Sequence, residues 1–172
     1  MKIAKSYDTQ GYTPANAQTE MQQAITALGN NGFAGVYDAN DGIATGAITA
    51  MKDAGINPAS RPTTGQDAEL DGIQRILAGQ QYMTVYKAVK TEAQDAARLA
   101  VPLAKGEPLP ASLINGHTKS GTTSVPSVIL TPVAVTKANV ASTVIKDGYW
   151  TPAQICTPAF ASACKAAGIP GA

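Results

Sequence analysis

The sequence has few of the residues that catalytic and metal sites require. Its 172 residues include one histidine, His117, and two cysteines, Cys156 and Cys164, too few for a dedicated zinc site. No GxGxxG pattern follows a strand, and the run 116–123, GHTKSGTT, lacks the Gly-Lys-Ser/Thr order of a phosphate loop. We expect that run to be a mobile polar loop. Since no nucleophile and base stand at a recognised spacing, we predict that the protein is not an enzyme and uses no cofactor or metal.

Strong charge and long apolar runs are also missing. Thirteen Lys and Arg residues nearly balance twelve Asp and Glu residues, and the net charge is +1, so there is no electrostatic basis for binding nucleic acid or an anionic membrane. No apolar run approaches the ~20 residues needed to span a bilayer. The N-terminus lacks the pattern of a secretory signal, and we expect any export signal to have been removed or never to have been part of this chain.

Patterns typical of strands and helices alternate along the chain, whose hydrophobic content of 44% is enough for one domain with a core. This alternation predicts an α/β fold with a parallel sheet and helices on both faces. The expected strands are Lys2–Tyr7, Phe33–Tyr37, Arg61–Gly65, Tyr82–Tyr86, Ser112–Ile114 and Ser127–Val135. The expected helices begin after Thr13, Asn40 and Asp67 and cover Ala88–Lys105, Lys137–Ile145 and about Ala159–Ala167.

Polar residues follow three successive strands of the predicted sheet. Asn40, Asp67 and Lys87 each stand at the carboxyl end of a strand, and these ends converge on one edge of a parallel sheet, where ligands bind. Amide, carboxylate and ammonium groups together suit the hydroxyls of a polyol. Tyr12, in the loop after the first expected strand, could place an aromatic face against a sugar ring.

Each of these residues also has a simpler structural interpretation. Asn40 and Asp67 could both be helix N-caps, Lys87 could be a solvated surface lysine, and Tyr12 could be partly buried. Asp38 and Asp41 beside Asn40 suggest calcium, but the downstream glutamate of a calcium loop is missing.

The two cysteines, Cys156 and Cys164, allow two arrangements. They could be separate buried thiols, or they could form a local disulfide. A disulfide would indicate an oxidising compartment outside the cytoplasm.

Three segments of the sequence carry a resemblance to a known family. DANDGIATGAITAMKDAGI, TGQDAELDGIQRILAGQQYMTVYK and ARLAVPLAKGE resemble the periplasmic sugar-binding proteins of ABC importers, in the ribose/galactose-type family and its D-xylose-binding branch. The tail TKANV…TVIKDGYWTPAQIC resembles the same branch. The resemblance covers nearly the whole chain, and NDG, GQDA and TVYK in this order are specific together. It implies one Rossmann-like, flavodoxin-like three-layer lobe of a type I periplasmic binding protein.

The resemblance also implies a ligand and its contacts. By position, Asn40, Asp67 and Lys87 match residues that hydrogen-bond the monosaccharide in the C-terminal lobe of this family. Tyr12 matches a ring-stacking aromatic residue that is typically Trp in the family. We therefore expect a non-catalytic lobe that binds D-xylose or a similar sugar and works with an ABC permease through the full-length protein.

The whole chain, residues 1–172, matches only the C-terminal lobe, with 88–131 as the crossover segment that would contact the missing N-terminal lobe. Half of a clamp encloses a small sugar incompletely, so we expect weak binding. Helix Ala88–Lys105 has an apolar stripe, listed in full as Val89, Ala93, Ala96, Ala97, Ala100 and Leu103, with Leu99 on a flank. We expect the missing lobe or a homodimer to cover it, and favour the homodimer.

The resemblance places the protein outside the cytoplasm, in the periplasm or anchored to the cell surface as a lipoprotein. In such a compartment we predict that Cys156 and Cys164 form a disulfide. Two alternative functions remain at this stage: the effector or dimerisation domain of a sugar-responsive repressor, and a stand-alone flavodoxin-like interaction module. The absence of a helix-turn-helix pattern and the pair of cysteines argue against the repressor.

Overall fold

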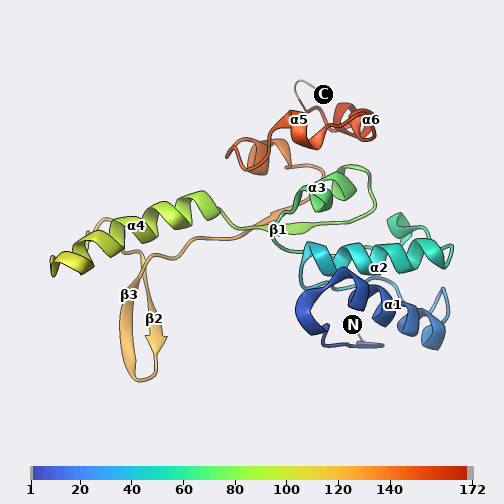
Figure 1. The fold of residues 1–172 in the computed structure, drawn as a ribbon, viewed down its shortest axis with the longest axis horizontal. Helices are drawn as coiled ribbons and strands as arrows, with labels where there is room; N and C mark the ends of the chain where they lie inside the picture. The colour runs from blue at the N-terminus through green and yellow to red at the C-terminus, as the bar shows by residue number, and fades with distance from the viewer. Residues whose placement is uncertain (1, 170–172) are drawn as a thin grey trace. The chain divides into compact units, whose positions relative to one another are not determined.

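The computed structural model describes residues 2–169 and divides the chain into two compact units. The first unit comprises Met1–Tyr86 and Val133–Ala172, and the second comprises Lys87–Pro132. Figure 1 shows the elements of both units, which we describe separately. The second unit differs by one residue at each end from the expected segment 88–131. What that segment contacts in a longer protein stays a prediction.

The first unit contains most of the helices and a short antiparallel strand pair (Figure 1). Its α-helices are α1 (Pro14–Leu28), α2 (Asp41–Asp53), α3 (Leu70–Leu77), α5 (Pro152–Ile155) and α6 (Ala161–Ala166), and its strands are β1 (Thr84–Tyr86) and β4 (Val133–Val135). Single turns of 3-10 or π-helix are η1 (Gln10–Tyr12), η2 (Pro58–Ser60) and η3 (Ala141–Ile145). The expected helix at Lys137–Ile145 is thus only the π-helical turn η3.

Helices α1 and α2 pack closely and form a hydrophobic core. The side chain of Thr13 caps α1 by accepting the Asn16 N–H, and Pro14 occupies the first helical position, where proline loses no helical hydrogen bond. The core contains residues from the predicted apolar faces of both helices, namely Met21, Ala24, Ala44, Ala47, Ile48 and Met51. A Cβ atom on Gly46 would lie 2.7 Å from the backbone nitrogen of Gln18, so a side chain there would separate the helices.

Parallel pairing in the first unit is present but shorter than the sequence predicts. Val36 and Thr63 form an isolated parallel bridge, and the Val36 N–H donates to the Pro62 carbonyl at 2.9 Å. The preceding hydrogen bond of the parallel ladder would need an N–H on residue 62, which proline lacks. The strands expected at Phe33–Tyr37 and Arg61–Gly65 are therefore reduced to this bridge.

The pairing continues from Thr63 to β1 and from β1 to β4. The Tyr82 N–H donates to the Thr63 carbonyl at 3.0 Å and the Val85 N–H to the Gly65 carbonyl at 3.2 Å. Strand β1 then pairs antiparallel with β4, with Val85 opposite Ala134. These contacts place the carboxyl ends of three segments side by side, namely those that contain Val36, Thr63 and β1.

The strand expected at Lys2–Tyr7 is wrong. The structure assigns no strand to residues 2–7, whose side chains are exposed. An extended segment becomes a strand only through hydrogen bonds to a neighbour, and residues 2–7 make no backbone–backbone hydrogen bond within the described chain.

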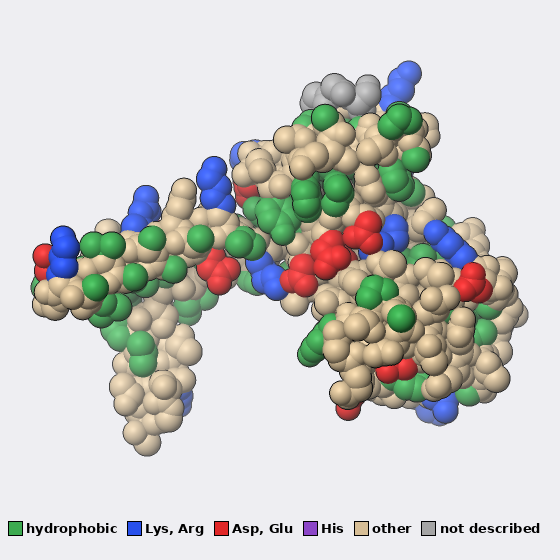
Figure 2. Space-filling view, viewed as in Figure 1, with side chains coloured by type: hydrophobic (Ala, Val, Ile, Leu, Met, Phe, Trp, Pro, Cys, Tyr) green, Lys and Arg blue, Asp and Glu red, His purple; other side chains and the backbone are tan. Residues whose placement is uncertain are grey.

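The second unit contains helix α4 (Val89–Lys105) and a hairpin of β2 (Gly116–Ser120) and β3 (Thr123–Ser127). Helix α4 ends at Gly106 in a left-handed conformation, and none of its residues is buried. Figure 2 shows hydrophobic side chains along α4, and Leu103 is 61% exposed. The described helices include none with the length and apolar character needed to cross a bilayer.

Three predictions for the second unit and its junction are wrong. Run 116–123 is a paired hairpin rather than a mobile loop, because Gly121 adopts the left-handed conformation, with φ of 60°, that a tight turn requires. Ser112–Ile114 contains no strand. The strand expected at Ser127–Val135 is split, since Ser127 ends β3 and β4 begins only after Pro132, which cannot donate to a ladder.

A disulfide joins Cys156 and Cys164 after α5 and within α6. Their Cα atoms lie 5.9 Å apart. Cys164 is fully buried, so the bridge lies against the interior of the C-terminal segment. Of the two arrangements that the sequence left open, the structure therefore has the disulfide.

Candidate functional site

Asn40 lies at the start of α2, where the chain leaves the parallel bridge at Val36. Its Oδ1 accepts the Ile43 N–H at 2.8 Å, so the N-cap interpretation of this residue is correct. An amide that caps through its oxygen still carries two N–H donors on Nδ2. Capping holds the side chain at the end of the helix, and both roles are compatible.

Asp67 is not a helix cap. Helix α3 begins at Leu70 with Glu69 as its N-cap residue, and Asp67 lies two residues earlier. Asp67 has φ of 94° and Ala68 has φ of 52°, in the left-handed region that residues with a Cβ atom rarely adopt. Such conformations cost about 1–3 kcal/mol each and persist where surrounding contacts hold them.

Backbone hydrogen bonds bring Asn40 and Asp67 to the same edge of the first unit. Asp41, next to Asn40, donates its N–H to the Gln66 carbonyl at 2.9 Å. Asp67 in turn donates its N–H to the Val85 carbonyl of β1, also at 2.9 Å. We call the edge formed by Tyr12, Asn40 and Asp67 the polar edge.

Tyr12 joins this edge through its backbone. It is 66% exposed, so the partly buried alternative for this side chain is wrong. A Cβ atom on Gly42 would lie 3.8 Å from the Tyr12 carbonyl and 3.6 Å from Asn40 Oδ1, so the Tyr12 turn lies beside the start of α2. Lys87 is half-buried, directly follows Tyr86 of β1 and is the first residue of the second unit.

Asp41, which the sequence suggested only as a candidate calcium ligand, is a buried carboxylate behind the polar edge. Asp41 is fully buried, and its carboxylate accepts hydrogen bonds from Gln81 Nε2 at 2.7 Å, the Glu69 N–H at 2.8 Å and Thr84 Oγ1 at 2.9 Å. Burial raises the pKa of Asp41, while these hydrogen bonds and the charge of Arg75 oppose that rise. The sequence signal was the pairing of Asn40 with Asp41 in NDG.

Arg75 on α3 extends this buried network. Its Nε donates to Gln81 Oε1 at 3.0 Å, and its terminal nitrogens donate to the Asp41 carbonyl, to Thr45 Oγ1 and to the carboxylate of Asp71. The Asp71–Arg75 pair has the i, i+4 spacing of a helical ion pair, a signal that the sequence offered. The network connects α2, α3 and the segment before β1.

Asp38 is a second buried carboxylate near the polar edge. It is 4% exposed, and within residues 2–169 its Oδ2 has no hydrogen-bond partner. Burial raises the pKa of Asp38 to about 7, with Arg75 opposing the rise and Asp41 adding to it. The described residues contain no group of three or more metal-ligating side chains.

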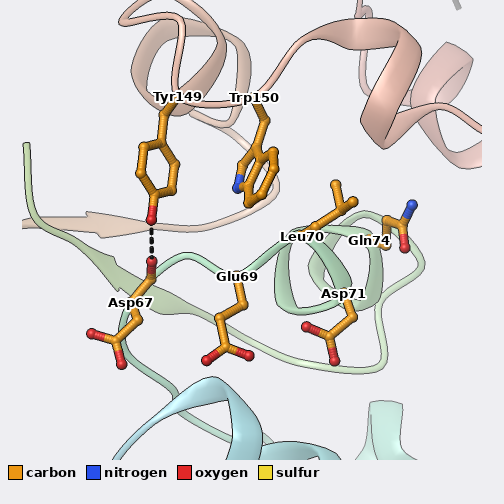
Figure 3. Close-up of a pocket in the computed structure, with 7 residues that line it drawn as sticks. All are labelled: Asp67, Glu69, Leu70, Asp71, Gln74, Tyr149 and Trp150. Carbon is orange, nitrogen blue, oxygen red and sulfur yellow. Dashed lines mark hydrogen bonds between the residues drawn. The ribbon is translucent and has the colours of Figure 1, made fainter. Parts of the chain in front are cut away.

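A shallow pocket of about 610 Å³ adjoins the polar edge beside α3. Figure 3 shows Tyr149 and Trp150 on one side of it, with Asp67, Glu69 and Asp71 on the other. Tyr149 donates its hydroxyl to the Asp67 carbonyl at 3.3 Å, and Trp150 donates its Nε1–H to the Ala68 carbonyl at 2.8 Å. These aromatic residues therefore stabilise the left-handed turn through its carbonyl groups.

Glu69 lies between the pocket and the Asp41 network. Its partial burial and the negative charges of Asp71, Asp41 and Asp67 raise its pKa. This concentration of carboxylates gives the pocket a negative potential. Hydroxyl and ammonium donors on a ligand would be favoured there, and anionic ligands would not.

Residues 1–108 match the model of the family described as periplasmic binding protein domain. The D-xylose-binding periplasmic protein of Escherichia coli (strain K12) is 42% identical over 150 residues, which cover 87% of this chain and 44% of that protein. The multiple sugar-binding periplasmic protein SbpA of Azospirillum brasilense is 35% identical over 147 residues, covering 81% of this chain and 40% of that protein. The chain spans less than half the length of these curated relatives.

Solved structures show the same relationship. A carbohydrate transporter solute binding protein from Chloroflexus aurantiacus, in complex with D-glucose, superposes with a TM-score of 0.70 at 30% identity, covering 82% of this chain and 41% of that one. The Caulobacter myo-inositol binding protein, bound to myo-inositol, gives a TM-score of 0.63 at 27% identity, covering 80% and 41%. With its α/β fold of one type I lobe, the chain belongs to the periplasmic binding protein domain family.

Proposed function

We propose that this chain is the monosaccharide-binding lobe of the solute-binding component of an ABC sugar importer, with D-xylose or a similar sugar as ligand. This role is non-catalytic and lies outside the cytoplasm. The names of the relatives support the proposal, since they are periplasmic proteins that bind D-xylose or several sugars. They favour it over a repressor domain or a stand-alone interaction module.

The observation that carries the proposal is the strained turn at Asp67, which lies beside Asn40, the N-cap residue of α2. Asp67 has φ of 94° and is held by hydrogen bonds on both sides of the turn. Residues held in such conformations cluster at ligand-binding and active sites. A carboxylate next to an amide can accept from and donate to neighbouring hydroxyls, as a sugar requires.

We assign the other two predicted residues supporting roles. Tyr12 is exposed beside Asn40 and offers its ring to the C–H face of a sugar. Lys87 follows β1, the strand whose Val85 carbonyl holds Asp67, and offers charge-assisted donation to a hydroxyl. All four residues belong to one proposed ligand set: Tyr12, Asn40, Asp67 and Lys87.

One lobe should bind its sugar weakly. A small polar ligand needs enclosure on most of its surface, and the chain spans only 44% of its Escherichia coli relative. We expect a Kd in the millimolar range or weaker, which corresponds to roughly −4 kcal/mol or less favourable. A second lobe, in a longer chain or another molecule, would supply the remaining contacts and the productive interaction with the permease.

Titration of 15N-labelled protein with D-xylose tests this proposal. We expect shifts of the backbone amides at Asn40 and at Asp67–Glu69, saturating only at millimolar sugar. Asp67→Ala should weaken binding, so that these shifts saturate only at a higher sugar concentration. Asp53→Ala is the matched control, because it removes a carboxylate from the opposite end of α2 and should leave them unchanged. Micromolar binding would refute the single-lobe argument, and the absence of any shift at high sugar would refute the proposed function.

A further inference from the structure

The carboxylate of Asp41 lies where three separate segments meet. Oδ1 accepts the amide of Gln81, which precedes β1, and Oδ2 accepts both the Glu69 N–H before α3 and the Thr84 hydroxyl of β1. These partners stand 40, 28 and 43 residues from Asp41 in the sequence. One side chain therefore connects the start of α2 with the segment after Asp67 and with β1.

The contacts of Asp41 flank the strained turn on both sides. Its backbone N–H holds the carbonyl of Gln66 immediately before Asp67, and its Oδ2 holds the N–H of Glu69 immediately after Ala68. The same Oδ2 accepts the hydroxyl of Thr84, whose oxygen accepts the Ala68 N–H at 3.1 Å. Asp41 thus acts on each peptide group around Asp67 directly or through Thr84.

The carboxylate is also closely confined. A Cβ atom on Gly72 would lie 2.6 Å from Asp41 Cγ, and one on Gly65 would lie 2.5 Å from the Gln81 nitrogen that bonds Asp41. Two glycines therefore leave just enough room for the group and allow it little freedom. Such confinement is what holding a backbone turn to a fixed geometry needs.

We propose that Asp41 is the positioning residue of the polar edge: its buried carboxylate sets the left-handed turn that presents Asp67 beside Asn40. The side chain itself is fully buried, so it acts through the turn and not on the sugar. The inference deepens the proposed function and rests on it for the identity of the ligand. The conformation of the turn is measured without ligand, which separates the two claims.

The first experiment compares Asp41→Asn with the wild type by NMR in the absence of sugar. Asparagine keeps the shape but replaces one acceptor oxygen with a donor, so either Gln81 or the Glu69–Thr84 pair loses its acceptor. We expect the amide signals of Ala68 and Glu69 to move and the HN–Hα coupling of Asp67 to leave its left-handed value. Ile48→Ala, a core truncation on the same helix, is the control and should lower stability without changing the turn.

A pair of variants at Thr84 keeps the proposal testable if Asp41→Asn does not fold. Thr84→Val removes the hydroxyl between Asp41 and the Ala68 N–H, whereas Thr84→Ser retains it. We expect the valine variant to disturb the turn and the serine variant to keep its wild-type geometry. If Asp67 keeps its wild-type HN–Hα coupling in both Asp41→Asn and Thr84→Val, the positioning role is refuted. If Asp41→Asn does not fold, an unchanged coupling in Thr84→Val is sufficient to refute it.

A double-mutant cycle with D-xylose then asks whether Asp41 acts through Asp67. Asp41→Asn should weaken binding about fivefold or more, since it removes at least one buried hydrogen bond from the turn. In an Asp67→Ala background the same change should have no further effect. An equal loss in both backgrounds would overturn the inference. If the wild type does not respond to D-xylose at all, the proposed function fails while the ligand-free measurements still decide the role of Asp41.

Discussion

Replacing Asp38 by asparagine should favour the folded protein more at alkaline pH than at acidic pH. Asp38 is 4% exposed, its Oδ2 lacks a partner within the described chain, and burial raises its pKa from 3.8 to about 7. A rise of that size corresponds to between about 4 and 5 kcal/mol, at about 1.4 kcal/mol per pKa unit. The ionised carboxylate is therefore costly in the folded state.

The sign of the effect follows from proton binding in the two states. Below pH 3.8 the carboxyl is protonated whether the chain is folded or not. Between that pH and about 7 the folded protein keeps the proton and the unfolded chain does not, so the contribution of Asp38 to stability declines as the pH rises through this window. Above about pH 7 the full cost is present.

Asparagine removes the ionisation but introduces a buried amide, which can cost about 1–3 kcal/mol if it finds no partner. That cost is the same at every pH and cancels in the comparison, so the raised pKa alone sets the difference, and we expect Asp38→Asn to gain about 2–3 kcal/mol at pH 8 over its effect at pH 5. Urea unfolding followed by the fluorescence of the single tryptophan, Trp150, measures the difference.

The comparison must be between variant and wild type at each pH, because burial also raises the pKa of Asp41 and Glu69. Asp53→Asn, an exposed carboxylate at the end of α2, is the matched control and should show no pH-dependent difference. An Asp38→Asn effect that is the same at pH 5 and pH 8 would refute the reasoning.

Three further predictions concern stability and assembly. Gly72→Ala should lower the free energy of unfolding, measured with urea, by at least about 2 kcal/mol, because its Cβ atom would lie 2.6 Å from the confined carboxylate of Asp41. A variant as stable as the wild type would contradict the confinement. Reducing the disulfide should lower the free energy of unfolding by about 2.5 kcal/mol, as closure of a loop with a sequence separation of 8 implies. Free alkylation of Cys156 and Cys164 in denatured, non-reduced protein would exclude the bridge. Leu103→Glu should dissociate the predicted homodimer in light scattering across a dilution series, since Leu103 is 61% exposed on α4; a monomer whose mass and Tm do not respond to the change would exclude that dimer.

The sequence predicted the local features of the first unit well. Thr13 and Asn40 stand at the starts of their helices as expected, and the side chain of each caps its helix. These features depend on interactions between residues three or four positions apart, so residue type and spacing are sufficient to identify them. The order of the NDG, GQDA and TVYK segments was likewise enough to indicate the family, which the matches confirm.

Strand extents were predicted poorly, because a strand depends on its neighbour as much as on its own residues. Lys2–Tyr7 has a plausible strand pattern but no hydrogen-bonded partner in the described chain. Pairing beside Val36 stops at Pro62, and the polar run ending at Thr123 forms a hairpin because Gly121 adopts a left-handed turn. Pattern alone does not report which segments meet.

The candidate site likewise combines residues that the sequence predicted with a backbone geometry that it did not. Residue type and position predicted Asn40, Asp67, Tyr12 and Lys87, and the fold brings the first three to one edge. The left-handed turn at Asp67 was decided by tertiary structure, because the groups that hold it come from Asp41 and from the distant segments 84–85 and 149–150. Contacts between residues tens of positions apart leave no periodic signal in a sequence, and only the folded chain brings such groups within hydrogen-bonding distance.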